Sequence, residues 1–94
     1  MSINIKGAKY KVKIKPLDQN TAGLCYRDRK EIHINSEIPK NDFFKVLSHE
    51  IGHAYFTEFK IDHIISDEME EFICLMLEDY AQTILEISGK KWGK

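Results

Sequence analysis

The sequence contains few of the residues that mark specialised classes of protein. Its 94 residues include two cysteines, two prolines and one tryptophan, and the formal net charge is −1. Cys25 and Cys74 stand far apart and form neither a CxxC pair nor a disulfide-rich framework, so we expect two reduced thiols. A net charge this close to zero gives no bulk attraction to nucleic acids or membranes.

Long apolar runs are also missing. No apolar stretch approaches the roughly 20 residues that a transmembrane helix needs. The N-terminal stretch MSINIKGAKYKVKIK alternates lysine with apolar residues and lacks the apolar region of a signal peptide. We therefore expect a cytoplasmic protein without a membrane partner, and the length suits one domain over residues 1–94.

The residues that are present predict an α+β fold with a small antiparallel sheet. In residues 9–15, KYKVKIK, apolar residues alternate with four lysines, as in a half-buried strand. Residues 24–26 and 31–35 flank the tetrapeptide RDRK and predict a β-hairpin. We expect its second strand, EIHIN, to turn Ile32 and Ile34 inward and its polar residues outward, namely Glu31, His33 and Asn35.

Two main helices are predicted to pack on this sheet. Apolar spacings of three and four mark an amphipathic helix over residues 43–56, with Asn41 or Asp42 as N-cap. Ser66 should cap a second helix that runs to about residue 87, with Gly89 just beyond its end. Its middle, FICLML, is apolar all round, so we expect it to be buried on most sides, and Trp92 to pack back onto the body.

The first helix contains the motif that most strongly suggests a function. In SHEIGHAYF, residues 48–56, His49 and His53 are four positions apart and share a helical face, where both imidazoles can bind one metal ion. Glu50 is rotated by about 100°, too far for a ligand but within reach of a metal-bound water. This H-E-x-x-H spacing predicts a zinc site with Glu50 as general base. The alternative is a solvent-exposed face that happens to hold two histidines. Gly52 costs about 1 kcal/mol of helix propensity relative to Ala and would let another segment come close.

A site with two histidines needs a third protein ligand. A third histidine six positions after His53 is absent, because Phe59 stands there, and His63 falls in the loop between the helices. Glu71 shares a helical face with Cys74, whose small side chain would let the first helix approach. Periodicity alone does not choose among the three glutamates of the second helix's first turns, Glu68, Glu70 and Glu71.

SHEIGHAYF, followed by EEFIC at residues 70–74, resembles the small zincins of the ImmA/IrrE-like metallopeptidase group over roughly residues 20–85. Many members of that group are short proteins of phages and mobile elements. The resemblance implies a minimal zincin-like fold, Zn²⁺ as cofactor, and a glutamate ligand three positions before a small residue. It therefore selects Glu71, three positions before Cys74, with Glu70 in reserve.

The implied function is zinc-dependent hydrolysis of a peptide bond in a protein substrate. Glu50 would take a proton from the zinc-bound water and deliver it to the leaving amine. An extended substrate could add as a further strand at the edge of EIHIN. Tyr55, His33 and Tyr26 are candidates for stabilising the oxyanion, although structural roles suit each of them better.

The main alternative is a catalytically inactive zincin-like domain that serves as a protein-binding or DNA-associated regulatory module. The lysines of residues 9–15 form a positive stripe that could contact phosphates. Lysines on an exposed strand more often prevent edge-to-edge aggregation, so we expect no nucleic-acid partner. Glu50 favours the enzyme, because a purely structural zinc site has no use for a general base.

Overall fold

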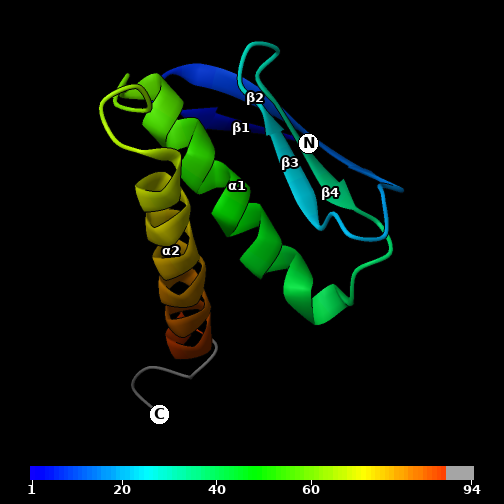
Figure 1. Ribbon diagram of the computed structural model, residues 1–94. Coiled ribbons are helices and arrows are strands. Elements are labelled where there is room, and N and C mark those ends of the chain that lie inside the picture. Colours follow the sequence, from blue (N-terminus) through cyan, green and yellow to red (C-terminus); the bar gives the residue numbers. More distant parts are fainter. Residues whose placement is uncertain (89–94) are drawn as a thin grey trace.

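The computed structural model describes residues 1–88, which form a four-stranded sheet and two long helices (Figure 1). The elements in chain order are β1 (Ser2–Ile5), β2 (Ala8–Lys15), β3 (Gly23–Tyr26), β4 (Glu31–Asn35), the 3-10 turn η1 (Lys40–Asp42), α1 (Phe43–Glu58) and α2 (Asp67–Ser88). The α+β class and the two main helices are as predicted. The expectations for Gly89 and Trp92 lie outside the described residues.

The sheet is mixed, which corrects the prediction of an antiparallel sheet. Its strand order is β1-β2-β4-β3. The hairpin of β3 and β4 forms around RDRK as predicted, but β4 then pairs in parallel with β2, with Val12 opposite Ile32. Alternation of apolar residues predicts which side chains of a strand share a face, but not which other strand pairs with it. The parallel pairing of β2 with β4 could therefore not be predicted from the sequence.

β4 is a central strand, and two of its three polar side chains are buried, whereas the prediction turned all three to solvent. His33 and Asn35 are nearly inaccessible. The Asn35 amide organises the loop before β3: its Oδ1 accepts hydrogen bonds from the backbone N–H of Leu17 and Glu37, and its Nδ2 donates to the carbonyl of Thr21 (2.8 Å). The outer face of β4 is therefore covered by this loop and by neighbouring strands, which the alternation could not show.

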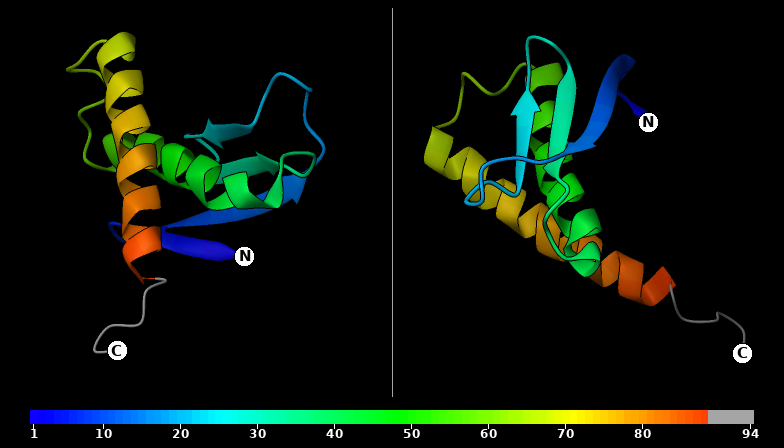
Figure 2. Two further views of the ribbon diagram at one scale, coloured as in Figure 1. Left: turned by 90° about the horizontal axis from the view of Figure 1, so that it is seen from below. Right: turned by 90° about the vertical axis from the view of Figure 1, so that its right-hand side faces the viewer.

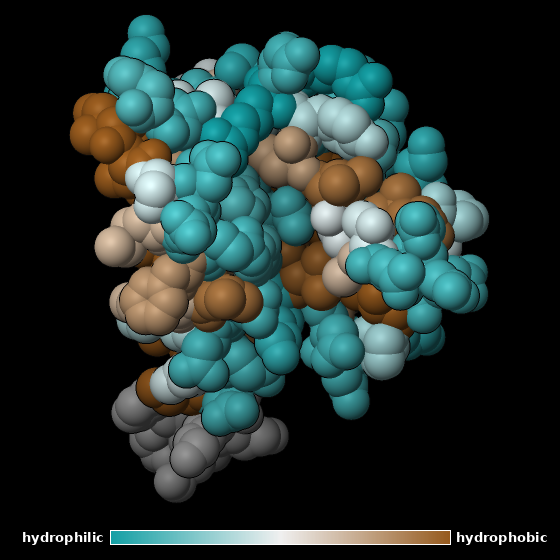
Figure 3. Space-filling model, in the orientation of Figure 1, coloured by the Kyte–Doolittle hydropathy of each residue, from teal (hydrophilic) through white to brown (hydrophobic). Residues whose placement is uncertain are grey.

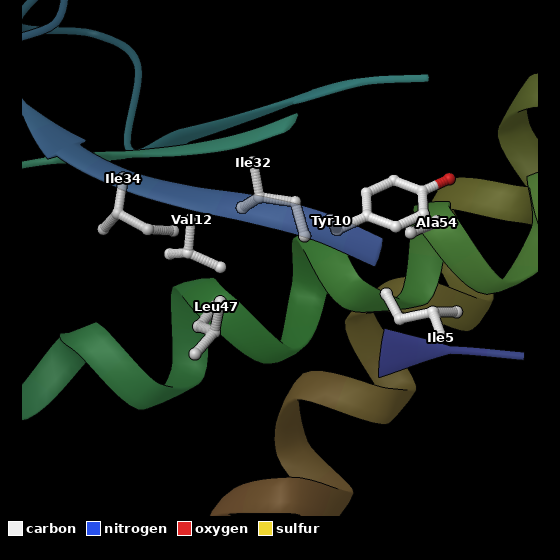
Figure 4. Close-up of a cluster of buried hydrophobic side chains, with 7 residues drawn as sticks. All are labelled: Ile5, Tyr10, Val12, Ile32, Ile34, Leu47 and Ala54. Atoms are coloured by element: carbon white, nitrogen blue, oxygen red, sulfur yellow. The ribbon is translucent and has the colours of Figure 1, made fainter. Parts of the chain in front are cut away.

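α1 lies across one face of the sheet, and α2 packs on α1 at the side of that pair (Figures 1 and 2). The core fills the space between the sheet and α1 (Figure 4). Its buried apolar members are Ile5, Tyr10, Val12, Ile32, Ile34, Leu47 and Ala54. The sheet and α1 thus form a rigid base, and α2 is held to it mainly through α1.

α2 begins as predicted, because Ser66 Oγ accepts a hydrogen bond from the backbone N–H of Met69 (3.1 Å). The segment FICLML, however, is not buried on most sides: Phe72 is 58% exposed and Met76 is 55% exposed. The reason is that, within residues 1–88, α2 packs on one helix, α1, which covers only the side of α2 around Glu70 and Cys74.

The four lysines of β2 are exposed, opposite the buried side chains of Tyr10 and Val12. Ile14 continues the alternation of Tyr10 and Val12, but it is 58% exposed and lines an open groove beside Pro39 and Phe43 at the start of α1. Within residues 1–88, no helix combines the length and the apolar character needed to cross a membrane.

A substitution at Tyr10 tests how much its hydrogen bond contributes to the stability of the fold. Its buried ring places the hydroxyl where it donates a 2.6 Å hydrogen bond to Glu58 Oε2, which also accepts from Lys30 Nζ (2.7 Å). Tyr10→Phe should lower the free energy of unfolding in urea by about 1 kcal/mol at pH 7. The matched control is Tyr80→Phe, since Tyr80 is 65% exposed on α2. An equal loss in both variants would contradict this account.

The hydroxyl group of Tyr10 should also make the free energy of unfolding depend on pH. Burial, and then the Glu58 carboxylate, raise the pKa of Tyr10 in the folded chain. A raised pKa contributes stability that is fully present below about pH 10, where an unfolded tyrosine begins to ionise, and that is lost above it. The stability difference between wild type and Tyr10→Phe should therefore shrink as the pH rises from about 10.

Candidate metal centre

α1 brings the three residues of the H-E-x-x-H motif to one cleft, and α2 adds Glu71 to them. Glu71 Oε2 lies 3.0 Å from His49 Nε2, and Glu71 Oε1 lies 3.2 Å from His53 Nε2. Donor atoms bound to one tetrahedral zinc, at about 2.0–2.1 Å each, stand about 3.3 Å apart. One donor atom from each of His49, His53 and Glu71 lies within 4.8 Å of the other two, so the three side chains are close enough to share one metal ion.

The other nitrogen of each imidazole is held by a second carboxylate of α2. His49 Nδ1 lies 3.0 Å from Glu78 Oε1, and His53 Nδ1 lies 2.5 Å from Glu70 Oε2. An ionised carboxylate can only accept, so His49 Nδ1 donates to Glu78. His53 Nδ1 lies between the carboxylate of Glu70 and the guanidinium of Arg27, whose Nη2 is 3.3 Å away. These contacts fix the orientation of each ring, and a neutral imidazole that donates from Nδ1 keeps its Nε2 lone pair free for a metal.

The resulting cluster fits a cation. The Nε2 atoms of His49 and His53 both face the carboxylate of Glu71. A cation between these groups, either a metal ion or added protons, would be attracted by the carboxylate, whose side chain is 50% exposed. Two imidazoles and one carboxylate are the donor set of a catalytic zinc site, which leaves a fourth position open.

Glu50 lies beside this cluster and not within it. It lines the same cleft, of about 370 Å³, as His49, His53 and Glu71, and its side chain is largely buried. Burial raises the pKa of Glu50, while the adjacent histidines act in the opposite sense. The carboxylate therefore faces the space that a metal ligand or substrate would occupy, as a general base must.

The remaining candidates fall elsewhere. Glu70 is buried and holds the Nδ1 side of His53, and His63 is exposed in the loop between the helices. None of the candidates for oxyanion stabilisation lines the cleft: Tyr55 lies in a separate groove with Phe59, and Tyr26 and His33 pack against each other.

The sequence analysis missed Arg27 and Glu78. Arg27 belongs to the turn between β3 and β4, and its guanidinium binds Glu70 and also Asp62 Oδ2 (3.0 Å). Arg27 therefore links Glu70, the carboxylate beside His53 Nδ1, to the loop between the helices. Nothing in the tetrapeptide RDRK indicates that Arg27 contacts Glu70. Glu78 could have been found, because it lies on the helical face of Glu71 and Cys74, two turns after Glu71 and one turn after Cys74.

The strand beside the cleft is β3, which corrects the expectation that EIHIN offers an edge. β4 is paired on both sides, and β3 is the terminal strand. Asn35 N donates to Ala22 O (2.8 Å), and hydrogen-bonded pairs alternate along an antiparallel ladder. The backbone N–H and C=O groups of Gly23 and Cys25 consequently point away from β4, on the side where both residues line the cleft.

Two small residues let the elements of the site approach. A Cβ on Gly52 would lie 3.0 Å from Cys74 Sγ, so α1 and α2 meet closely there, as predicted from their sizes. A Cβ on Gly23 would lie 2.8 Å from Val46 Cγ1 and 3.0 Å from Glu50 Cγ.

Cys25 and Cys74 are free thiols, and burial raises the pKa of each to about 12, so neither is a reactive thiolate at neutral pH.

Comparison with protein-family models, curated proteins and solved structures gives no match to this chain. The resemblance to the ImmA/IrrE-like group therefore stays a prediction. The function of the chain has to be inferred from the geometry of its own cleft.

Gly23 tests how tightly β3 packs on the motif helix. Gly23→Ala should lower the free energy of unfolding by about 1–3 kcal/mol, because the added methyl group overlaps Val46 and crowds Glu50. In a Val46→Ala background, which removes Cγ1, the same substitution should cost measurably less. Urea denaturation of the four proteins gives the coupling, and strictly additive losses would contradict the close approach.

Proposed function

We propose that this chain is a zinc-dependent metallopeptidase that hydrolyses a peptide bond in a protein substrate. The observation that carries the proposal is the pairing of both Nδ1 atoms with carboxylates, which presents two Nε2 atoms to Glu71. His49, His53 and Glu71 would hold Zn²⁺. Bound there, the ion would act as a Lewis acid toward a carbonyl group and lower the pKa of a water molecule to about 7.

Glu50 would serve as general base and then as general acid. Its carboxylate lies on the same helix as both histidines, so α1 fixes its position relative to the ligands. It would accept the proton of the attacking water and later deliver it to the leaving amine. Burial and the packing of Gly23 against its side chain hold the carboxylate in place, which reduces the reorganisation needed during the reaction.

β3 supports a peptide as the substrate. The outward N–H and C=O groups of Gly23 and Cys25 offer the hydrogen bonds of one more antiparallel or parallel strand. An extended chain bound there would pass along the cleft that Glu50, His49 and His53 line. Backbone pairing of this kind positions any peptide bond, and side-chain pockets then select the sequence.

Zinc affinity tests the assignment of ligands. Glu71→Gln should lower the affinity for Zn²⁺ by more than about 100-fold, and Glu78→Gln, which loosens His49, by about 10–100-fold. The control is Glu68→Gln, which removes an exposed carboxylate of the same turn of α2 and should bind zinc like the wild type. Competition titration with a chromogenic chelator measures all three. Equal affinities across the series would contradict the site.

Hydrolysis tests the role of Glu50. A mixture of unstructured peptides of random sequence, incubated with zinc-loaded protein and analysed by mass spectrometry, should show cleavage that Glu50→Gln slows by about 10²–10⁴-fold. That variant should keep its zinc, and loss of the metal would instead make Glu50 a ligand. Stoichiometric zinc without any cleavage would favour the alternative, a zincin-like domain that only binds its partner.

A further inference from the structure

The side of α2 that faces away from α1 is apolar along the whole helix. Its members are spaced by three and four residues, and we call them the outer face of α2: Met69, Phe72, Met76, Tyr80, Ile84 and Ile87. At 100° per residue they span an arc of about 100–120°. Most are exposed by 38 to 65% of their surface. Figure 3 shows apolar side chains gathered along α2 at the left-hand edge of the molecule.

This surface is large for an isolated chain. The exposed apolar area of the outer face is on the order of 500 Å², near the upper limit for the largest apolar patch of a typical monomer. It also matches the apolar part of a standard interface, which buries about 800 Å² on each partner. The spacing by three and four residues is the pattern that one helix presents to another.

Charge decides which kind of helix fits. α2 contains no lysine or arginine, while seven of its residues are acidic: Asp67, Glu68, Glu70, Glu71, Glu78, Asp79 and Glu86. Of these, Glu68, Asp79 and Glu86 fall along one border of the outer face on a helical projection. Two α2 helices packed against each other in antiparallel orientation would bring these borders together and repel.

A groove on the outer face combines both properties. It has a volume of about 510 Å³ and is lined by Phe72, Leu75, Met76, Asp79, Tyr80 and Thr83. Its walls are mostly apolar, and their polar groups are the carboxylate of Asp79 and the hydroxyls of Tyr80 and Thr83. A side chain with an aliphatic stem and a cationic end, such as lysine or arginine, matches this lining.

We propose that the outer face of α2 binds a cationic amphipathic helix of a partner protein. The apolar side of that helix would cover Phe72, Met76 and Tyr80, and its lysines or arginines would meet Glu68, Asp79 and Glu86. The surface lies on the opposite side of α2 from the cluster around Glu70 and Glu78. The proposal therefore does not depend on zinc or on hydrolysis.

A defined probe tests the proposal on the full chain. The probe is a synthetic amphipathic helical peptide of leucine and lysine, labelled for fluorescence anisotropy, compared with the same peptide carrying glutamate for lysine. The lysine peptide should bind and the glutamate peptide should not. Tyr80→Ser/Ile84→Ser should weaken binding by about tenfold or more. Asp79→Asn/Glu86→Gln should weaken it at low salt and much less at high salt.

Matched controls keep the outcome clear. Ile14→Ser removes an equally exposed apolar side chain on the sheet, and Glu37→Gln removes an exposed carboxylate outside α2. Both should bind the peptide like the wild type, and all variants should keep the unfolding transition and zinc affinity of the wild type. Equal binding by the outer-face variants would overturn the proposal. So would sedimentation that shows dimers which Tyr80→Ser/Ile84→Ser separates, because a second copy would then cover the face.

Discussion

The close contact between α1 and α2 at Gly52 sets the geometry of the whole site. A Cβ at this position would stand 3.0 Å from Cys74 Sγ and 3.2 Å from Leu77 Cδ1, so no larger residue fits without moving α2. His49 and His53 belong to α1, and the carboxylates that contact them belong to α2. Glu71 Oε2 lies 3.0 Å from His49 Nε2, and Glu70 Oε2 lies 2.5 Å from His53 Nδ1. A separation larger by the width of a methyl group would break all of these contacts together. Gly52 lowers the helix propensity of α1, and the contacts between α1 and α2 that it permits offset this cost.

The second constraint is electrostatic. Glu50, Glu70, Glu71 and Glu78 surround two imidazoles. Two cations reach these carboxylates: Arg27 from the turn between β3 and β4 contacts Glu70, and Lys45 of α1 lies 3.8 Å from Glu78. Arg27 neutralises Glu70 and anchors it to the turn between β3 and β4. The cluster nevertheless retains more carboxylates than cations among residues 1–88. A divalent metal ion would remove this excess, so under the proposed function zinc should raise the stability of the fold.

The sequence was sufficient for the features that are local. The spacing of His49, Glu50 and His53 predicted their placement on one helix, and the sizes of Gly52 and Cys74 predicted the contact between helices. Features that depend on distant partners were not predictable. The parallel pairing of β4 with β2, the burial of Asn35 and the reach of Arg27 depend on which strands and turns lie side by side. The exposure of Phe72 and Met76 was missed because periodicity reports that a residue is apolar, not that a neighbour exists to cover it.

The central claim is that two imidazoles and a carboxylate of this chain bind one zinc ion. X-ray absorption spectroscopy of the protein with one equivalent of Zn²⁺ tests it most directly. The account predicts a first shell of nitrogen and oxygen at about 2.0–2.1 Å with the outer-shell scattering of two imidazoles and no sulfur. Zinc that fails to bind stoichiometrically, or a sulfur shell at about 2.3 Å from Cys25 or Cys74, would contradict it.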